Sequence, residues 1–462
     1  FRFCAKVKPP QTQRLTAGGK KATLKTLLKN KGEYVHMALV KPFQGVRFNT
    51  GIAGKIEELV CPPYDVISEE QRKAYIEKNE NNIIRLELPK GDNPYRSAHD
   101  IFTQWKEKGI LKTEDLPAVY IYEEEFEACG KRTKVKGMIC RVKIEDFSKG
   151  VILPHEFTLS KAKEDRLNLM KATNCNFSQI YSLFMDPAHC TTQKLDSLST
   201  GAPDIHLTDN DNVTHRLWIV TDQAAISSLC ADFDDRKLYI ADGHHRYETA
   251  LNYRNWCYAQ GKSAPGGAAD YQMMMLVDME HPGLAVFPTH RLVRNLENFD
   301  PKQAMAACTQ YFTITEKTGV ASMEAELDKL FQEDKTAFGF YCGGDTWAQL
   351  VLKDPSVMQA LLPDKSAATR ELDVTVLHTL ILEQLFGIDA ENMAKQINLT
   401  YTKVFDEAIT SVKSGASQCA FILNPTKVTQ IRNVAAAGEK MPQKSTYFYP
   451  KLITGLVLNE LV

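Results

Sequence analysis

Two imidazoles and a guanidinium follow a glycine in the run Ala241-Asp-Gly-His-His-Arg246. Residues 238–240 are apolar and strand-forming, the glycine permits a tight turn, and the residues after it predict a helix. Three cation-capable side chains are thus expected on the first turn of a helix, where backbone N–H groups attract anions. Such a cluster would be costly without a negative partner, so it indicates a bound phosphate; the alternative is an Asp242 N-cap among solvated basic residues. The candidate phosphate-binding residues are Gly243, His244, His245 and Arg246.

A second charged motif runs from Pro154 to Arg166. Thr158 or Ser160 can cap a helix here, and the two residues before the cap would lie beside the positive end of that helix. Glu156 is a candidate general base or Mg²⁺ ligand, and His155 a candidate for holding a phosphate or protonating a leaving oxygen. The alternative is a solvated, salt-bridged helix. The helix supplies three further candidates, Lys163, Asp165 and Arg166.

A third cluster lies in a proline-bounded turn near the end of the sequence, where Lys444, Ser445 and Thr446 offer an ammonium and two hydroxyls. It resembles a phosphate cradle but lacks the glycine-rich loop and following helix of a P-loop, and a surface turn is the alternative. Tyr64 follows two prolines on a rigid bend, from which its ring would stack on a base or pack in the core. There is no Walker A sequence, no Gly-x-Gly-x-x-Gly after a strand, no Gly-x-Ser-x-Gly elbow and no His-Glu-x-x-His.

Composition narrows the class of protein. The 462 residues are 44% hydrophobic and 24% charged, as in ordinary globular proteins, and the formal charge of -1 disfavours a general nucleic-acid or membrane binder. No apolar stretch approaches the ~20 residues needed to cross a bilayer. The eleven cysteines include no Cys-x-x-Cys pair, which indicates reduced thiols inside a cell. We therefore expect an intracellular protein, cytoplasmic by default.

The N-terminal residues are unusual, because residues 1–32 hold nine Lys or Arg and no acid. We expect a flexible basic arm over residues 1–33. A mitochondrial or plastid transit remnant is the alternative, although Lys predominates and Ser is absent. Residues 34–298 are expected to form the phosphate-binding N-terminal and central region, and 299–462 a C-terminal α/β region.

Hydrophobic patterning indicates an α+β or mixed α/β fold. A hairpin is expected from strands at 118–126 and 133–142, and residues 206–211 are expected to be a loop. Other expected strands are 83–88, 181–185, 213–220 and 271–277. Expected helices are 68–78, 95–108, 405–413, 427–437 and, with the strongest core spacing, 372–386, which could also join a homodimer.

Together these clusters resemble the bacterial and eukaryotic family catalogued as domain of unknown function 1015. The resemblance runs in order over nearly the whole chain after the N-terminal arm. The matching stretches are 61–68, 154–159, 163–167, 241–250, 372–378 and 441–451.

The residues 242–246 also resemble the phosphate-binding signature of the ParB, sulfiredoxin and free-serine-kinase superfamily, in which a strand, turn and helix grip nucleotide phosphates. Free serine kinases carry a very similar Asp-Gly-His-His-Arg string. The resemblance implies a ParB/sulfiredoxin-like nucleotide-binding core, a nucleoside di- or triphosphate and Mg²⁺. The long C-terminal region departs from the short kinase pattern.

The resulting hypothesis is a nucleotide-dependent phosphotransferase acting on a small hydroxylated metabolite, such as serine or a related hydroxy acid. Asp242 would hold Mg²⁺ or orient the acceptor hydroxyl, Glu156 or Asp165 would act as base or metal ligand, and nearby cations would neutralise developing charge. The alternatives are a ParB-like nucleotide switch with little turnover and a metal-dependent phosphohydrolase. Nucleotide and a small molecule are the expected partners, and neither membrane nor nucleic acid is expected.

Overall fold

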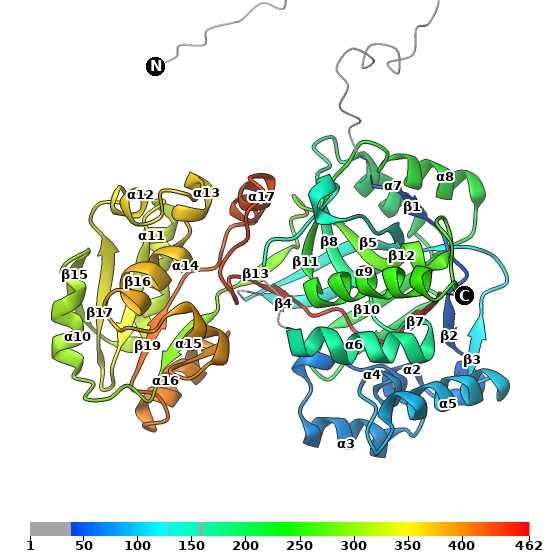
Figure 1. The fold of residues 1–462 in the computed structure, drawn as a ribbon, viewed down its shortest axis with the longest axis horizontal. Coiled ribbons are helices and arrows are strands. Elements are labelled where there is room, and N and C mark those ends of the chain that lie inside the picture. The colour runs from blue at the N-terminus through cyan, green and yellow to red at the C-terminus, as the bar shows by residue number, and fades with distance from the viewer. Residues whose placement is uncertain (1–37, 129, 157–159, 462) are drawn as a thin grey trace, which may run out of the picture. The chain divides into compact units, whose positions relative to one another are not determined.

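The computed structural model describes residues 38–128, 130–156 and 160–461, apart from the side chains of residues 160–162. The predicted basic arm and the predicted Thr158 cap therefore lie outside the described residues. Figure 1 shows the helices and strands of the described residues, whose bounds follow.

One large mixed sheet contains β1 (Val40–Lys41), β4 (Val119–Ala128), β5 (Lys131–Lys143), β6 (Ile152–Leu153), β8 (Ile180–Phe184), β9 (Ile205–Thr208), β10 (Thr214–Val220), β11 (Leu238–Asp242) and β12 (Tyr271–Asp278). The strand order is β6-β11-β8-β12-β5-β4-β10-β9, with β1 beside β5. β11 runs parallel to β6, and β12 to β8, whereas β4 and β5 form the predicted antiparallel pair. Every residue of β12 is buried, as its continuous apolar run requires of a strand covered on both faces.

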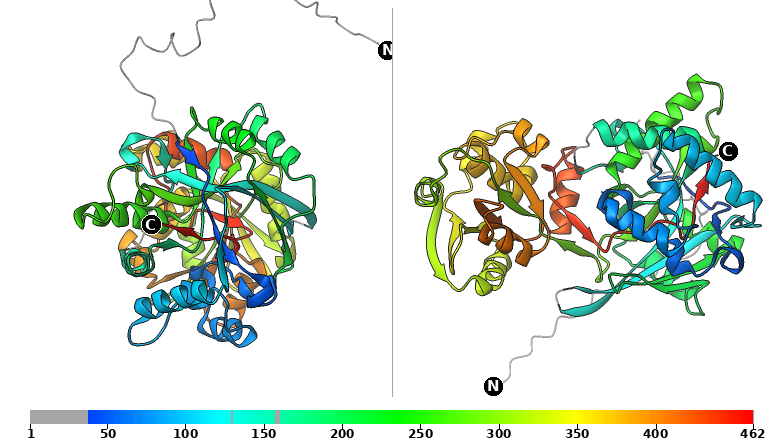
Figure 2. Two further views of the ribbon diagram at one scale, coloured as in Figure 1. Left: turned by 90° about the vertical axis from the view of Figure 1, so that its right-hand side faces the viewer. Right: turned by 90° about the horizontal axis from the view of Figure 1, so that it is seen from below.

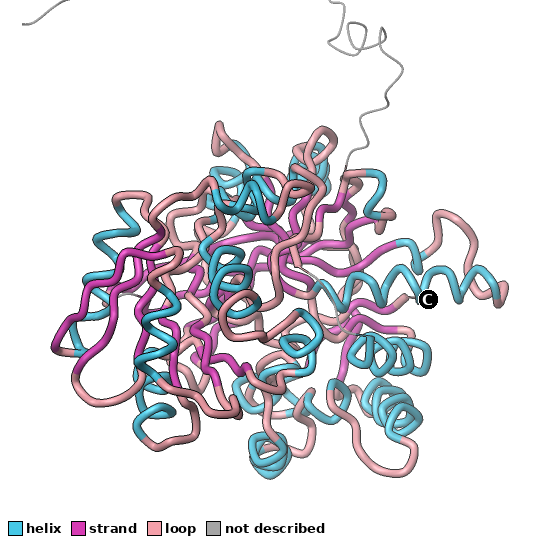
Figure 3. The backbone as a smooth tube through the Cα atoms, turned by 60° about the vertical axis from the view of Figure 1, so that its left-hand side comes forward, coloured by secondary structure: helices cyan, strands magenta, loops and turns pink. Residues whose placement is uncertain are grey.

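A second sheet contains β14 (His290–Val293), β15 (Phe312–Thr318), β16 (Ala337–Tyr341), β17 (Thr346–Leu352), β18 (Leu399–Thr402) and β19 (Cys419–Ile422). Its order is β15-β17-β16-β19-β14-β18, and all neighbours are antiparallel. In Figure 3 the magenta strands of both sheets lie among cyan helices. The mixed α/β fold is confirmed.

Three short pairs complete the strands: β2 (Val46–Phe48) with β3 (Leu111–Thr113), β7 (Cys175–Asn176) with β21 (Asn459–Glu460), and β13 (Ala285–Phe287) with β20 (Tyr447–Tyr449). The chain thus returns to its first half near its end, and the red C-terminal segment in Figure 2 lies among elements in blue and green. Two of these pairs thus join a strand before residue 298 to a strand after it. The predicted domain boundary at residue 298 stays a prediction.

The helices of the first half are α1 (Thr50–Ala53), α2 (Ile56–Leu59), α3 (Glu69–Lys78), α4 (Ile84–Glu87), α5 (Pro94–Glu107), α6 (Ser160–Thr173), α7 (Cys190–Leu198), α8 (Gln223–Ala231) and α9 (His244–Ala259). Those of the second half are α10 (Pro301–Cys308), α11 (Met323–Gln332), α12 (Val357–Leu361), α13 (Ala367–Arg370), α14 (Asp373–Val376), α15 (Ala390–Lys395), α16 (Phe405–Lys413) and α17 (Val428–Ala436), with a π-helix, η6 (Leu377–Glu383).

Helix α9 fixes the position of the predicted phosphate turn. Tyr247, Ala250 and Tyr253 of α9 pack on one face of the large sheet, together with strand residues such as Ile240. Residues of the opposite face pack against the C-terminal segment, including Leu452. Because β11 and α9 are both anchored in this core, the turn between them is held on both sides.

Three predicted elements need correction. The predicted strand at 83–88 is instead helix α4, which spans Ile84–Glu87, because a short apolar run does not by itself distinguish a buried strand from a buried helix. The expected loop at 206–211 begins within strand β9, which pairs with β10. The expected helix 372–386 is α14 followed by η6, and its apolar side chains are buried in the core of the six-stranded sheet, which leaves the homodimer without support.

Candidate functional site

The glycine turn forms as predicted between β11 and α9. Gly243 has φ +95°, a conformation that side-chain-bearing residues rarely adopt. No side chain caps the first turn of α9, so the helix start carries its positive end toward the adjacent space. A Cβ at Gly243 would come within 3.0 Å of the Arg246 guanidinium. The close approach of Arg246 to the turn therefore also requires a glycine at this position.

This turn lines a cavity of about 580 Å³, a volume in the range of small-molecule sites. Elements of both large sheets contribute to its wall. Residues 400–403, in and after β18 of the six-stranded sheet, lie on it together with the β11–α9 turn of the nine-stranded sheet. The predicted site residues that line it are Tyr64, Glu156, Asp242, Gly243, His244, His245, Arg246, Lys444 and Thr446.

Asp242 is held between two cations. One carboxylate oxygen accepts from Arg246 at 2.7 Å, and the other is paired with Lys451. Burial favours the neutral acid, but Lys451 and Arg246 together hold the pKa of Asp242 below its usual range. The Arg246 guanidinium also donates to the backbone carbonyl of Gln179, so its direction is fixed. Asp242 therefore acts as a carboxylate that orients two cations at the cavity.

His155 lies behind the cavity wall and is fully buried. Its Nδ1 lies 2.6 Å from the Ile240 carbonyl oxygen, and its Nε2 lies 3.0 Å from the Thr446 hydroxyl. Its backbone N–H donates to His244 Nε2 at 3.2 Å. Burial lowers the pKa of His155 to about 4, so the ring is neutral at pH 7 and joins β11 to the 446 turn. His155 does not line the cavity itself but contacts Thr446, which does, and its predicted acid–base role stays a prediction.

The neighbouring imidazole, His244, lies on the cavity side. The two rings meet edge to face with centroids 4.6 Å apart. Burial, and then the proximity of His155, lowers the pKa of His244 well below its usual value. Without a ligand, His244 is therefore a neutral imidazole at pH 7.

Glu156 joins the second and third sequence motifs. Its Oε1 accepts from the backbone N–H of Lys444 at 2.7 Å. The backbones of Glu156 and Met441 also pair as an isolated parallel β-bridge. Burial raises the pKa of Glu156, although the Lys444 N–H and ammonium oppose that shift. A carboxylate whose pKa is raised and which lies on a cavity is suited to take up a proton.

Other predicted residues lie outside the cavity wall. Lys163 is paired with Glu248 at 2.6 Å. Arg166 is buried, donates to Asp165 at 2.6 Å and to the Glu87 carbonyl at 2.7 Å, and covers the Tyr64 ring at 4.4 Å. Arg166 thus supports the wall through Tyr64, whose pKa burial raises to about 12.

Asp165 and Ser445 are further predicted residues that do not line the cavity. Asp165 also accepts from the Tyr95 hydroxyl at 3.0 Å. Ser445 is buried, and its hydroxyl donates to the Pro442 carbonyl. Their predicted catalytic and phosphate-binding roles stay predictions.

Two lysines of the cavity were missed as site residues. Lys451 belongs to the third motif, but its pairing with Asp242, 209 residues earlier in sequence, has no local signal. Lys403 donates to the Tyr447 hydroxyl at 2.7 Å and lies 4.3 Å from the centre of that ring. Neither Lys403 nor Lys444 has an ion pair within the described ranges. Nothing in the sequence around residue 403 distinguishes it from a surface lysine.

The predicted Mg²⁺ ligands can be tested against these contacts. Both carboxylate oxygens of Asp242 already face cations, and a divalent cation placed there would meet their repulsion. Asp242 therefore does not fit a magnesium ligand in this arrangement. Over residues 38–128, 130–156 and 160–461, no group of three or more His, Cys, Asp or Glu is placed to hold a metal ion.

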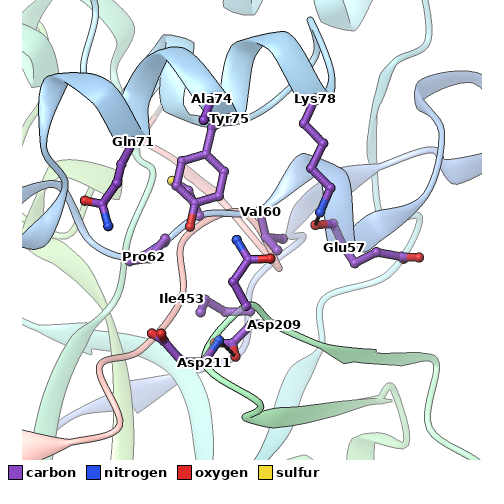
Figure 4. A pocket seen from close by; sticks show the side chains of 12 residues that line it. Glu57, Val60, Pro62, Gln71, Ala74, Tyr75, Lys78, Asp209, Asp211 and Ile453 are labelled. Atoms are coloured by element: carbon purple, nitrogen blue, oxygen red, sulfur yellow. Dashed lines mark hydrogen bonds between the residues drawn. The ribbon is translucent and has the colours of Figure 1, made fainter.

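A second cavity, of about 210 Å³, lies beneath helix α3 (Figure 4). Tyr75 and Lys78 of α3 face the turn after β9, which carries Asp209 and Asp211. Asp209 Oδ2 lies 3.1 Å from His215 Nε2, and its Oδ1 accepts two backbone N–H groups of its own turn. None of the predicted site residues lines this cavity.

The fold and the cationic cavity thus define a mixed α/β protein with a strand–glycine–helix site. The chain belongs to the family described as "Protein of unknown function (DUF1015)", whose model matches residues 40–375. The family resemblance of the sequence motifs is confirmed. No curated protein matches the sequence.

Several solved structures are distantly similar. A conserved hypothetical protein from Pyrococcus furiosus has 13% identity and a TM-score of 0.33 over 68% of this chain and 93% of its own. A free serine kinase in complex with AMP has 11% identity and a TM-score of 0.35 over 68% and 88%. SbnI from Staphylococcus aureus, with a C-terminal truncation, has 11% identity and a TM-score of 0.33 over 68% and 85%. None of the helices in the described part of the chain is long and apolar enough to cross a membrane.

Proposed function

We propose that the cavity at the Gly243 turn binds the phosphates of a nucleotide and that the protein transfers a phosphoryl group to a small hydroxylated metabolite. The observation that carries this proposal is the uncapped start of α9 on a cavity of about 580 Å³ lined by cations. Backbone N–H groups at a helix start and fixed positive side chains are complementary to phosphate oxygens. The sequence likeness to the phosphate signature of free serine kinases supports the same ligand.

Different residues of the cavity wall suit different parts of the reactants. Arg246, Lys444 and Lys451 bind the phosphates near the turn. Tyr401 and Tyr447, also on the wall, offer rings on which a nucleobase packs. The remaining space takes the acceptor, for which serine or a related hydroxy acid is the proposed class.

In the transfer step, the acceptor hydroxyl attacks the terminal phosphorus of a nucleoside triphosphate. Glu156 takes the hydroxyl proton on the carboxylate oxygen that Lys444 does not occupy, and the nucleoside diphosphate leaves with the bridging oxygen. Burial raises the pKa of Glu156 towards the range of a working base. Lysine and arginine at the turn stabilise the charge on the transferring group.

The first test is binding of ADP by calorimetry to the full chain and to Lys444→Gln. The backbone N–H of Lys444 makes the contact with Glu156, so the substitution removes the ammonium and leaves the turn intact. Losing one charge-assisted contact of ~2 kcal/mol weakens ADP binding about thirtyfold. Lys78→Gln, on the wall of the second cavity, is the matched control and leaves the affinity unchanged. Absence of ADP binding to the unmodified chain would overturn the proposal.

A nucleotide-binding switch with little turnover is the second candidate. It is favoured by the contribution of residues 400–403 to the wall, because a ligand there contacts elements of both sheets. Release of ADP from ATP, measured with and without a panel of hydroxy acids, separates the two. Turnover that rises with one acceptor supports the transferase, and turnover that no acceptor changes supports the switch.

A further inference from the structure

Arg291, on β14, is a buried guanidinium that the proposed reaction does not use. It is 1% exposed, and its Nη1 donates to the Thr289 carbonyl. Its other partners are also uncharged, and no carboxylate pairs with it in the described part of the chain. A buried charge without an opposite charge is costly, so this position needs a reason.

The remaining contacts of Arg291 lead to the candidate site. Its Nη2 donates to the backbone carbonyl of Lys444 at 3.1 Å and to that of Gln443 at 3.4 Å. Lys444 has φ +57° and donates its own N–H to Glu156. The turn is thus held from two sides, by a guanidinium on its carbonyls and by a carboxylate on its N–H.

His378 orients the guanidinium. Its Nε2 lies 3.2 Å from Arg291 Nε, which donates to it. Burial, and then Arg291, keeps the pKa of His378 well below its usual value, so a lone pair is available to accept. His378 lies in the π-helix η6, a rare conformation that is frequent at functional sites. The sequence motif 372–378, to which no role was attached, ends at this residue.

We propose that Arg291 is a positioning residue that, together with His378, holds the 443–444 turn so that Lys444 and Glu156 face the bound phosphates. The nature of the ligand rests on the proposed function. The six-stranded sheet thereby contributes to phosphate binding through a side chain that does not itself line the cavity.

The test compares Arg291→Met with Arg141→Met. Arg141 on β5 serves as the control. It is partly buried, and like Arg291 it has no ion pair in the described ranges and donates to a backbone carbonyl, that of Pro42, at 3.3 Å. Arg291→Met weakens ADP binding about tenfold, whereas Arg141→Met changes it less than twofold. Arg291→Lys keeps the charge without the planar fork and recovers only part of the affinity.

A pH profile separates positioning from a general loss of stability. Glu156 faces Lys444 on the turn, Lys451 on the C-terminal segment, Asp242 on β11 and Arg291 on β14. As Glu156 ionises with rising pH, it repels phosphate and ADP affinity falls. Arg291→Met removes a positive charge and loosens the N–H donor, so the midpoint of this fall moves to higher pH. In a background of Glu156→Gln, the shift disappears.

Hydrogen exchange of the amides at 442–446, measured without ligand, gives a readout independent of nucleotide. Exchange is faster in Arg291→Met than in Arg141→Met. Equal exchange in the two variants overturns the positioning role. Failure of the unmodified chain to bind ADP overturns the proposed function instead, and equal ADP affinity of the unmodified chain and Arg291→Met overturns the inference alone.

Discussion

The cavity at the Gly243 turn and the cavity beneath α3 differ in the charge of their walls. The first holds four cations and three carboxylates in addition to its imidazoles, whereas the second holds three carboxylates and one lysine. The charged residues of the first are Arg246, Lys403, Lys444, Lys451, Asp65, Glu156 and Asp242, and those of the second are Glu57, Asp209, Asp211 and Lys78. Both cavities are formed by segments far apart in the sequence, so this property does not distinguish one cavity from the other. Their difference lies in how the charges are balanced inside the protein.

In the cavity beneath α3, the best-placed carboxylate is satisfied locally. Asp209 accepts two N–H groups of its own turn and contacts His215, which in turn lies 2.7 Å from the Tyr122 hydroxyl. At the Gly243 turn, by contrast, the Lys444 ammonium and the nearby Arg291 form no ion pair within the described ranges, although the Glu156 carboxylate lies close enough to act on both. Cations without an ion pair, and not volume alone, therefore mark the cavity at the Gly243 turn as the candidate phosphate site.

Gly243→Ala breaks this comparison with the largest expected effect. The new Cβ would meet the Arg246 guanidinium at 3.0 Å, and φ +95° strains any side-chain-bearing residue. Displacement of Arg246 and of the helix start weakens ADP binding about a hundredfold, or ~2.7 kcal/mol, in calorimetry. Gly319→Ala is the control, because Gly319 has φ +86° with nothing within 4 Å of the added Cβ. Each substitution lowers the unfolding free energy by ~1–2 kcal/mol through backbone strain, but Gly319→Ala leaves ADP binding unchanged. Equal losses of ADP affinity in the two variants would contradict the assignment of the Gly243 turn as the phosphate site.

Local patterns were sufficient to predict the turn. Apolar strand residues, a glycine and a helix follow one another within 238–259, so each element is determined by neighbours in sequence. The same holds for α3, whose Ser68 cap and Gln71 form a reciprocal pair of hydrogen bonds. Elements of this kind need no knowledge of the rest of the fold.

The part of the cavity wall that residues 400–403 form could not be predicted from local patterns. Lys403 reaches the cavity because β18 pairs with β14, more than a hundred residues earlier in sequence. Charge patterning also suggested Lys163 and Arg166 as phosphate ligands, but Glu248, Asp165 and Glu87 engage them in the folded chain. Whether a charged side chain is free for a ligand depends on partners that only tertiary structure supplies.

Glu124→Gln tests the charges near the cavity beneath α3, because the Asp209 carboxylate of that cavity acts on Glu124. Glu124 is fully buried, contacts the Tyr122 hydroxyl at 3.2 Å, and burial raises its pKa to about 8. Because this pKa exceeds that of the unfolded chain, the protonated acid stabilises the fold at low pH, and the contribution is lost as pH rises towards 8. Glu124→Gln removes this titration and changes the slope of the unfolding free energy by ~1.4 kcal/mol per pH unit between about pH 5 and 8. Chemical denaturation over that pH range measures the slope.

Glu125, the next residue of β4, provides a control of opposite sign. Hydrogen bonding from Arg132 and Arg216, against a burial effect, lowers its pKa to about 2. Its contribution to stability is present above the unfolded pKa and is lost as pH falls. Glu125→Gln therefore lowers stability at pH 7 and leaves the slope between pH 5 and 8 unchanged; a changed slope there would argue against the burial of Glu124 as the cause.

Lys403→Gln is the mildest test of the cationic wall. Lys403 is exposed, and its ammonium lies against the Tyr447 ring, so water and salt screen its attraction for phosphate. ADP binding weakens about threefold at low salt, or ~0.6 kcal/mol, and the difference from the unmodified chain vanishes at high salt. Lys395→Gln, an exposed lysine paired with Glu391 on α15, serves as control and has no effect at either salt concentration. A loss of ADP affinity that persists at high salt would contradict this prediction. It would show that Lys403 contacts ADP directly and that β18 lies closer to the bound nucleotide than expected.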